Sequence, residues 1–199
     1  MDPAGPSERW RTWRAQVDLD EYDRRWERMA AAGEPVHGEA DAVVRLGGGR
    51  VLDAGCGTGR VAIELVSRGL DVVGVDNDPE MIARARAKSG AVEWIEADLA
   101  EVDLTGRTFD VIVLAGNILL FVEPGSEPSI VANLAPALAP GGALVVGNQT
   151  DAGALQAYDA WCADAGLELA ERWSTWEGDP YDGGSYAVSI HRRMALGDQ

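Results

Sequence analysis

The residues of this chain that could do chemistry begin with one short stretch, VLDAGCGTG at positions 51–59. An apolar run breaks there into Gly55, Gly57 and Gly59, and apolar residues at helical spacing follow. Glycines at every second position remove the Cβ atoms that would keep a ligand away from the main chain, and they allow positive φ angles. The stretch therefore predicts a strand, a tight turn and a helix that hold a ligand against bare backbone.

The spacing of the glycines separates two classes of ligand. In the dinucleotide fingerprint G-x-G-x-x-G, the third glycine would fall at position 60, where this chain has Arg60. Asp53 stands just before the turn, and a carboxylate there disfavours an anionic pyrophosphate but suits a ligand with an ammonium group. The turn therefore favours a positively charged cofactor over a dinucleotide.

The stretch VLDAGCGTG resembles motif I of the class I S-adenosylmethionine-dependent methyltransferases, whose cofactor carries both an ammonium and a sulfonium group. A second stretch, LAPALAPGGALVV at 134–146, resembles the helix, proline-glycine turn and fifth strand of the same family. The resemblance extends over residues 48–193. It implies transfer of a methyl group from S-adenosylmethionine to a small-molecule acceptor, with S-adenosylhomocysteine as the product.

The cofactor residues should gather where successive parallel strands end. Asp76 ends the second predicted strand, 21 positions after Gly55, which matches the offset at which a carboxylate meets ribose hydroxyls. The resemblance places Asp98 at the amino group of adenine, while Met81 suits either the adenine ring or the core. The full predicted cofactor-binding set is Asp53, Gly55, Cys56, Gly57, Asp76, Asn77, Met81, Asp98, Leu99 and Ala115.

Methyl transfer from a sulfonium is an in-line displacement on an activated carbon, so orientation can supply much of the catalysis and a base is optional. If the acceptor must lose a proton, the weak candidates for the base are His37, Asn117 and Tyr22. Family members that methylate nucleobase amino groups carry Asn or Asp, then Pro-Pro and an aromatic residue after the fourth strand. This chain has AGN at 115–117 instead, which disfavours a nucleobase as the methyl acceptor.

Length and composition fit a single α/β domain that acts on small molecules. The chain has 199 residues and a formal net charge of -16, which opposes binding to nucleic acid. No apolar run approaches the roughly 20 residues of a membrane span, and the first residues lack the apolar region of a signal peptide, so we predict a cytoplasmic protein. The spacing of Cys56 and Cys162 indicates neither a metal site nor a disulfide. The sequence does not predict an oligomeric state.

The pattern of the whole chain predicts a doubly wound α/β fold. Its mostly parallel, Rossmann-like sheet has seven strands and ends in a C-terminal antiparallel hairpin made of 167–176 and 185–193. Between the fourth strand and a fifth strand over 143–147, apolar spacing predicts a helix over 130–138 that Pro136 bends.

An N-terminal helical extension, residues 1–47, precedes the predicted cofactor-binding domain, residues 48–199. The extension carries four aromatic residues, Trp10, Trp13, Tyr22 and Trp26, before the first core strand. This aromatic stripe either packs permanently on the flank of the sheet or forms a lid over the cofactor, and the spacing is compatible with both. Two alternatives to a methyltransferase also stay open, a non-catalytic cofactor-binding protein and, less favoured, a nicotinamide-dependent oxidoreductase.

Overall fold

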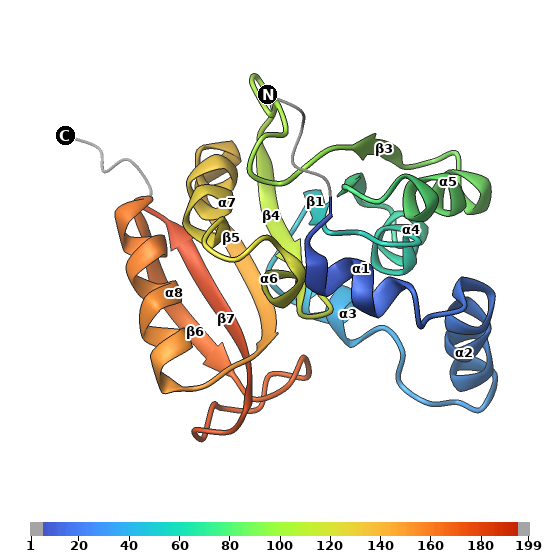
Figure 1. Ribbon diagram of the computed structural model, residues 1–199. Helices are drawn as coiled ribbons and strands as arrows, with labels where there is room; N and C mark the ends of the chain where they lie inside the picture. Colours follow the sequence, from blue (N-terminus) through green and yellow to red (C-terminus); the bar gives the residue numbers. More distant parts are fainter. Residues whose placement is uncertain (1–5, 195–199) are drawn as a thin grey trace.

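The structure is a computed structural model that describes residues 6–194. Its strands are β1 (Arg50–Ala54), β2 (Asp71–Asp76), β3 (Glu93–Glu96), β4 (Phe109–Leu114), β5 (Leu138–Gln149), β6 (Leu167–Trp173) and β7 (Tyr186–Arg193). They form one sheet in the order β3-β2-β1-β4-β5-β7-β6, in which β7 runs antiparallel to β5 and β6 (Figure 1). The predicted seven-stranded sheet with its C-terminal hairpin is confirmed.

Helices cover both faces of the sheet (Figure 1). They are α1 (Glu8–Arg14), α2 (Leu19–Ala31), α3 (Gly38–Arg45), α4 (Arg60–Ser67), α5 (Pro79–Lys88), α6 (Ile118–Phe121), α7 (Glu127–Leu134) and α8 (Ala152–Asp164), with a 3-10 turn η1 (Ala135–Ala137). One hydrophobic cluster joins α3, α4 and α5 to the sheet, and the other joins α7 and α8 to the opposite face. This is the doubly wound arrangement that the alternating pattern predicts.

The central strands read as continuous apolar runs because both of their faces are buried. In β1, Val51 packs in the cluster under α3 and α4, while the next residue, Leu52, packs in the cluster under α7 and α8. Both side chains are fully buried. Parallel strands that helices cover on both sides have this composition, so burial alone accounts for the apolar residues of β1.

Polar side chains start two of the helices that follow strands, α5 and α8. Asp78 accepts hydrogen bonds from the backbone N–H groups of Glu80 and Met81 and so caps α5, whose first residue is Pro79. Asp151 caps α8 in the same way. Because each helix begins just after the carboxyl end of a strand, these caps fix the edge of the sheet at which the loops converge.

The stretch between β4 and β5 corrects the sequence prediction. A single helix over 130–138, bent at Pro136, is wrong, because α7 ends at Leu134 and the chain continues through η1. Leu138 lies in β5 opposite Phe109, so the strand starts five residues before the predicted 143. Pro136 has no backbone N–H to continue the helix. Leu138 still packs in the same hydrophobic core as Leu134, but it does so from a strand.

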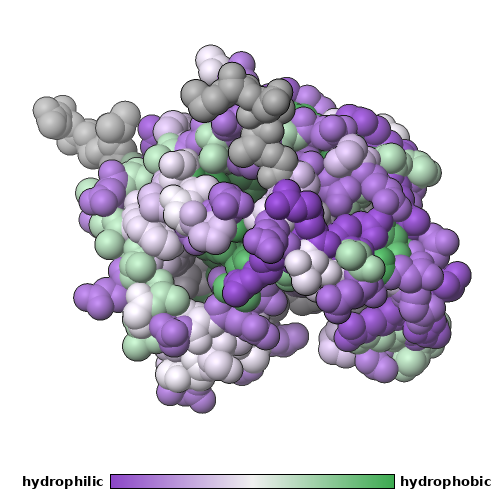
Figure 2. Space-filling model, in the orientation of Figure 1, coloured by the Kyte–Doolittle hydropathy of each residue, from purple (hydrophilic) through white to green (hydrophobic). Residues whose placement is uncertain are grey.

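The division of the chain into an N-terminal extension and a cofactor-binding domain at residue 47 stays a prediction. Residues 1–5 and 195–199 lie outside the described part of the chain. In the space-filling view, most of the visible face is hydrophilic, and hydrophobic residues lie mainly in its recesses (Figure 2). Over residues 6–194, no helix has both the length and the apolar character to cross a membrane.

Candidate active site

The glycine turn between β1 and α4 has the positive φ angles that its composition predicts. The φ angles are +83° at Gly55, +55° at Gly57 and +88° at Gly59. The backbone N–H groups of Gly55 and Cys56 both donate to the carbonyl of Val75, at 2.8 and 2.9 Å, which ties the turn to the end of β2. The backbone conformation is therefore one reason for glycine at all three positions.

The surroundings of the three glycines differ, and the difference locates the open space. A Cβ atom on Gly55 would lie 2.5 Å from the side chain of Ile118, and one on Gly59 would lie 2.6 Å from Trp94. A Cβ atom on Gly57 would meet nothing within 4 Å. Gly55 and Gly59 thus serve close packing, whereas Gly57 exposes its backbone to an open pocket.

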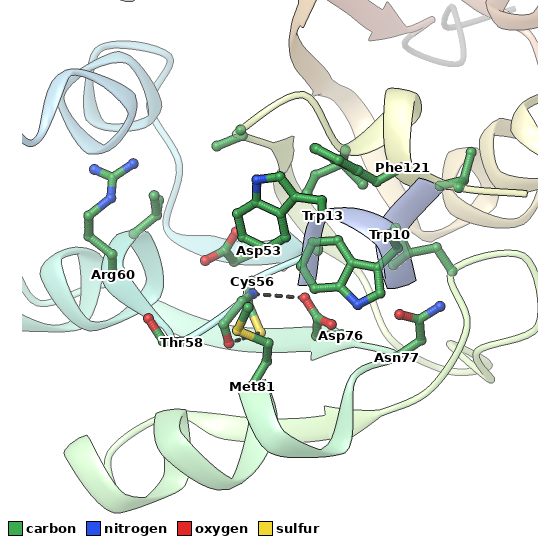
Figure 3. Close-up of a pocket in the computed structure, with 18 of the residues that line it drawn as sticks. Trp10, Trp13, Asp53, Cys56, Thr58, Arg60, Asp76, Asn77, Met81 and Phe121 are labelled. Atoms are coloured by element: carbon green, nitrogen blue, oxygen red, sulfur yellow. Dashed lines mark hydrogen bonds between the residues drawn. The ribbon is translucent and has the colours of Figure 1, made fainter. Parts of the chain in front are cut away.

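This pocket lies at the carboxyl ends of the central strands, under α1. Figure 3 shows residues of β1, the glycine turn, β2, α5 and α1 directed toward one space. All ten residues of the predicted cofactor set line it, namely Asp53, Gly55, Cys56, Gly57, Asp76, Asn77, Met81, Asp98, Leu99 and Ala115. The sequence prediction therefore gathers one set of neighbours, as the crevice rule for open α/β sheets requires.

Asp53 is the most deeply buried carboxylate of the pocket, with 2% of its surface exposed. Its Oδ2 accepts a hydrogen bond from the backbone N–H of Ala62 in α4 at 3.0 Å. Burial raises the pKa of Asp53 from its ordinary 3.8 to about 7, and the Ala62 hydrogen bond opposes that rise. A positive group placed beside Asp53 would relieve the cost of burying its charge.

Asp76 is held by the backbone on both sides of the pocket. Its Oδ2 accepts from the N–H of Gly57 at 2.8 Å (Figure 3). Its Oδ1 accepts from the N–H of Asp78 at 2.9 Å. Burial raises the pKa of Asp76 to about 6, against these backbone hydrogen bonds. Each carboxylate oxygen still has a lone pair for another donor, so Asp76 can hold the glycine turn and bind a ligand at the same time.

Cys56 lines the pocket but is unsuited to act as a nucleophile. Burial, together with the nearby charges of Asp53 and Asp76, raises the pKa of the Cys56 thiol well above its ordinary value. A thiol in such surroundings stays protonated and unreactive. Cys56 therefore contributes packing and shape.

Aromatic side chains form a roof over the turn. The rings of Trp10 and Trp13 stack with centroids 4.8 Å apart, and Phe121 of α6 lies 5.5 and 5.7 Å from them. In Figure 3 the two indoles lie above Asp53, Cys56 and Asp76. The predicted aromatic stripe thus covers the pocket, and all four of its members line it.

Polar contacts attach the two helices that carry this roof. None of the seven residues of α1 is buried, and α2 buries one. Trp10 Nε1 donates to Asp78 Oδ2 at 3.0 Å, while Asp23 of α2 accepts from Thr58 Oγ1 at 2.7 Å and pairs with Lys88 at 2.7 Å. Little apolar burial holds α1 and α2 to the domain, which is the character of a segment with low local stability.

Of the three proposed bases, the structure brings one to the pocket. Tyr22 lines it, whereas His37 and Asn117 do not. His37 lies 3.6 Å from Glu64, and the side chain of Asn117 accepts a hydrogen bond from the backbone N–H of Gln149 at 2.6 Å. Asn117 has the only positive φ of a non-glycine residue in the described chain, +63°, so its role in this structure is to turn the chain into α6.

The sequence reasoning missed the contribution of α6. Ile118 and Phe121 of this four-residue helix line the pocket, and so do Thr58 and Arg60 of the turn region. The apolar run ILLF after a Gly-Asn pair was a signal for a short buried element, but four residues carry too little periodicity to identify a helix.

Comparison with known proteins agrees with this geometry. A family model described as a methyltransferase domain matches residues 51–142. A phosphatidylethanolamine N-methyltransferase from Cereibacter sphaeroides is 32% identical over 158 residues, covering 72% of this chain and 76% of that protein. The chain belongs to the class I S-adenosylmethionine-dependent methyltransferases.

Structural similarity to another methyltransferase covers more of the chain. A TehB-like S-adenosylmethionine-dependent methyltransferase from Corynebacterium glutamicum matches with a TM-score of 0.78 and 32% identity, over 87% of this chain and 97% of that one. A ribosomal protein L11 methyltransferase from Xylella fastidiosa is 34% identical over 64% of this chain, which spans only 42% of that protein. Since relatives are named for lipid and protein acceptors, membership of the methyltransferase family leaves the acceptor open.

Membership of this family decides between the functional alternatives. The chain is an S-adenosylmethionine-dependent methyltransferase, so the nicotinamide-dependent oxidoreductase and the non-catalytic binding protein are set aside. Its cofactor is S-adenosylmethionine. The open backbone of Gly57 and the buried carboxylate of Asp53 leave space and negative charge in the pocket for a cation.

Proposed function

We propose that this methyltransferase holds S-adenosylmethionine in the pocket under α1 and passes its methyl group to a small-molecule acceptor. The observation that carries the proposal is the convergence of an unobstructed glycine backbone and three acidic residues, Asp53, Asp76 and Asp98, below an aromatic roof. A cofactor with an ammonium group, a ribose diol and an adenine amino group offers a donor for each carboxylate.

The three carboxylates take different parts of the cofactor. Asp53 has one oxygen committed to Ala62, and its other oxygen is assigned to the ammonium group. Asp76, at the end of β2, is assigned to the ribose hydroxyls. Asp98 accepts a hydrogen bond from the N–H of Ala100 at 2.8 Å through Oδ1, which leaves Oδ2 for the adenine amino group.

The carboxylate of the cofactor needs donors, and one corner of the pocket offers them. Arg60 is the only positively charged side chain among the described residues that line the pocket. Its guanidinium stacks 4.2 Å from the ring of Trp26 and pairs with Glu39, which leaves its Nε–H uncommitted. The buried Nε1–H of Trp26 also has no partner. We assign the cofactor carboxylate to these two donors, since each has a hydrogen bond left to give.

The cofactor supplies an activated methyl group, and the protein supplies orientation and exclusion of water. Trp10, Trp13 and Phe121 present apolar surface over the pocket, and Tyr22 adds a hydroxyl at the same wall. Such a roof can hold an acceptor in line with the methyl group, which is the largest contribution that this type of displacement requires. Among the candidate bases, Tyr22 stays the one in position to take a proton.

We propose a small-molecule acceptor because α1 covers the pocket and the space beneath it is bounded by aromatic side chains. Within the N-terminal part, residues 1–47, we propose that α1 and α2 act as a lid, since their polar attachments can break without uncovering a large apolar core. The third helix of this part, α3, packs in the hydrophobic cluster on the sheet and stays in place. A cytoplasmic location is retained as a prediction from the sequence.

Methyl transfer from labelled S-adenosylmethionine, measured against a set of small amines, alcohols and thiols, tests this proposal. Turnover of at least one small molecule supports it. Methylation confined to protein or lipid in parallel reactions would contradict the small-molecule acceptor. Binding of NAD without binding of S-adenosylhomocysteine, measured by calorimetry, would contradict the cofactor site itself.

A further inference from the structure

A second cavity lies behind α6. Leu119 and Leu120 of α6 line this second cavity, whereas Ile118 and Phe121 of the same helix line the cofactor pocket. The second cavity has a volume of about 130 Å³, and α8, β7 and the end of β5 complete its wall. Cavities of roughly this size hold one benzene ring in other proteins. One turn of helix therefore separates two spaces, each large enough for an organic group.

Two buried polar atoms in the second cavity have no hydrogen-bond partner. Tyr158 of α8 is 6% exposed, and its hydroxyl is unpaired. Asn148, near the end of β5, donates through Nδ2 to the carbonyl of Gln149 at 3.3 Å, but its buried Oδ1 accepts nothing. Unpaired polar atoms inside a protein are unfavourable and uncommon. Two of them on the wall of one cavity indicate that a ligand completes their hydrogen bonds.

Among the described residues, Glu127 is the one charged side chain that lines the second cavity. The carboxylate of Glu127, at the start of α7, accepts from the N–H of Gly125 through one oxygen and keeps the other free. Among the described residues, no Lys, Arg or His lines the cavity. The nearby Arg172 donates to Ser189 at 3.0 Å, and Asp159 balances its charge at 2.5 Å. The lining therefore carries one negative charge, that of Glu127, which a positively charged ligand would balance.

We propose that the second cavity binds a small protonated amine with an apolar body. The ammonium group donates to the free oxygen of Glu127 and to Oδ1 of Asn148, and the apolar body packs against Leu119, Leu120 and Val146. A neutral alcohol of the same shape forms weaker hydrogen bonds, and a carboxylate is repelled by Glu127. This site is independent of the cofactor pocket and of the reaction proposed for it.

Nuclear magnetic resonance with the full-length protein tests this site. Benzylamine, benzyl alcohol and benzoate are titrated separately at pH 7.5 and about 150 mM salt, which screens attraction to the negative surface. We expect saturable shifts of the backbone amides of Leu119, Leu120 and Thr150 with benzylamine. Benzyl alcohol should bind at least tenfold more weakly, and benzoate should cause no shift. Equal affinity of amine and alcohol, or no shift at these residues, would overturn the proposal.

Variants separate the site from general attraction to acidic residues. Glu127→Gln should weaken benzylamine binding at least fivefold, and Tyr158→Phe should also weaken it. Glu168→Gln removes the same charge from an exposed position of β6 and is the matched control, with affinity unchanged. Equal losses for the two glutamate variants would refute the site. S-adenosylhomocysteine affinity, measured alongside, reports on the cofactor pocket alone, so failure of that pocket would be seen separately.

Discussion

Replacing Asp53 with Asn should stabilise the ligand-free protein at neutral pH while weakening its cofactor binding. Asp53 is almost fully buried, and burial raises its pKa to about 7 from an ordinary 3.8. Asn keeps an oxygen for the N–H of Ala62 but has no charge to bury. The charge of Asp53 lowers the stability of the ligand-free protein, and the same charge is assigned to bind the ammonium group of the cofactor. Asp53→Asn should therefore raise the free energy of unfolding and lower the cofactor affinity.

The pH dependence gives the size of the effect. Below pH 3.8 the carboxyl is protonated in both the folded and the unfolded state, so its charge costs nothing. As the pH rises from 3.8 to about 7, the unfolded chain releases the proton and the folded protein retains it, so the wild type loses stability relative to Asp53→Asn. At about 1.36 kcal/mol per pKa unit, the advantage of the variant should grow by about 3 kcal/mol between pH 5 and pH 8.

Urea unfolding at pH 5, 6, 7 and 8 measures this growth. Asp110→Asn is the matched control, because Asp110, like Asp53, accepts hydrogen bonds from backbone N–H groups but lies exposed at the surface. The free-energy difference between Asp53→Asn and wild type should rise with pH and level off above pH 7, without such a rise in the control. A difference that stays constant from pH 5 to 8 would refute the buried charge. S-adenosylhomocysteine affinity should fall by roughly 1.5–3 kcal/mol in the same variant.

Three further changes follow from the same geometry. Asp76→Ala removes the acceptor assigned to the ribose hydroxyls, so calorimetry should show S-adenosylhomocysteine binding weaker by roughly 1.5–3 kcal/mol, and unaltered affinity would contradict the assignment. Gly57→Ala places a methyl group in open pocket space at positive φ, so it should abolish most cofactor binding, whereas Gly69→Ala, at φ +87° and also free of contacts within 4 Å, should cause only the backbone strain. Hydrogen exchange over residues 8–31 should slow when S-adenosylhomocysteine is added, and protection that is the same without ligand would show that α1 and α2 are fixed scaffold.

The sequence predicts the sheet and the grouping of ten residues around one pocket because each of those features has a local cause. Gly55, Gly57 and Gly59 need positive φ, and Asp78 caps a helix within its own neighbourhood. The alternation of buried strands with helices then places their carboxyl ends side by side, since parallel strands with short connections permit few other arrangements. The ten predicted residues lie together for this reason.

The parts that the sequence does not predict depend on contacts between distant segments. Leu138 has helical spacing from the residues before it, yet its pairing with Phe109 in β4 makes it part of a strand. His37 and Asn117 are polar residues that the sequence predicts near the ligand-binding edge of the sheet. In the structure, His37 lies beside Glu64, and the side chain of Asn117 accepts a hydrogen bond from the backbone N–H of Gln149. The roof of Trp10 and Phe121 joins residues 111 positions apart, which no local pattern contains.

A crystal structure of the protein with S-adenosylhomocysteine would show whether the cofactor binds in the pocket under α1. We expect the ligand along the glycine turn, with ribose hydroxyls about 2.7–3.0 Å from the carboxylate of Asp76 and the ammonium group beside Asp53. Its carboxylate should lie at Arg60 and Trp26. A ligand bound outside this pocket, or one that turns its carboxylate instead of its ammonium group toward Asp53, would rule out the proposed cofactor site.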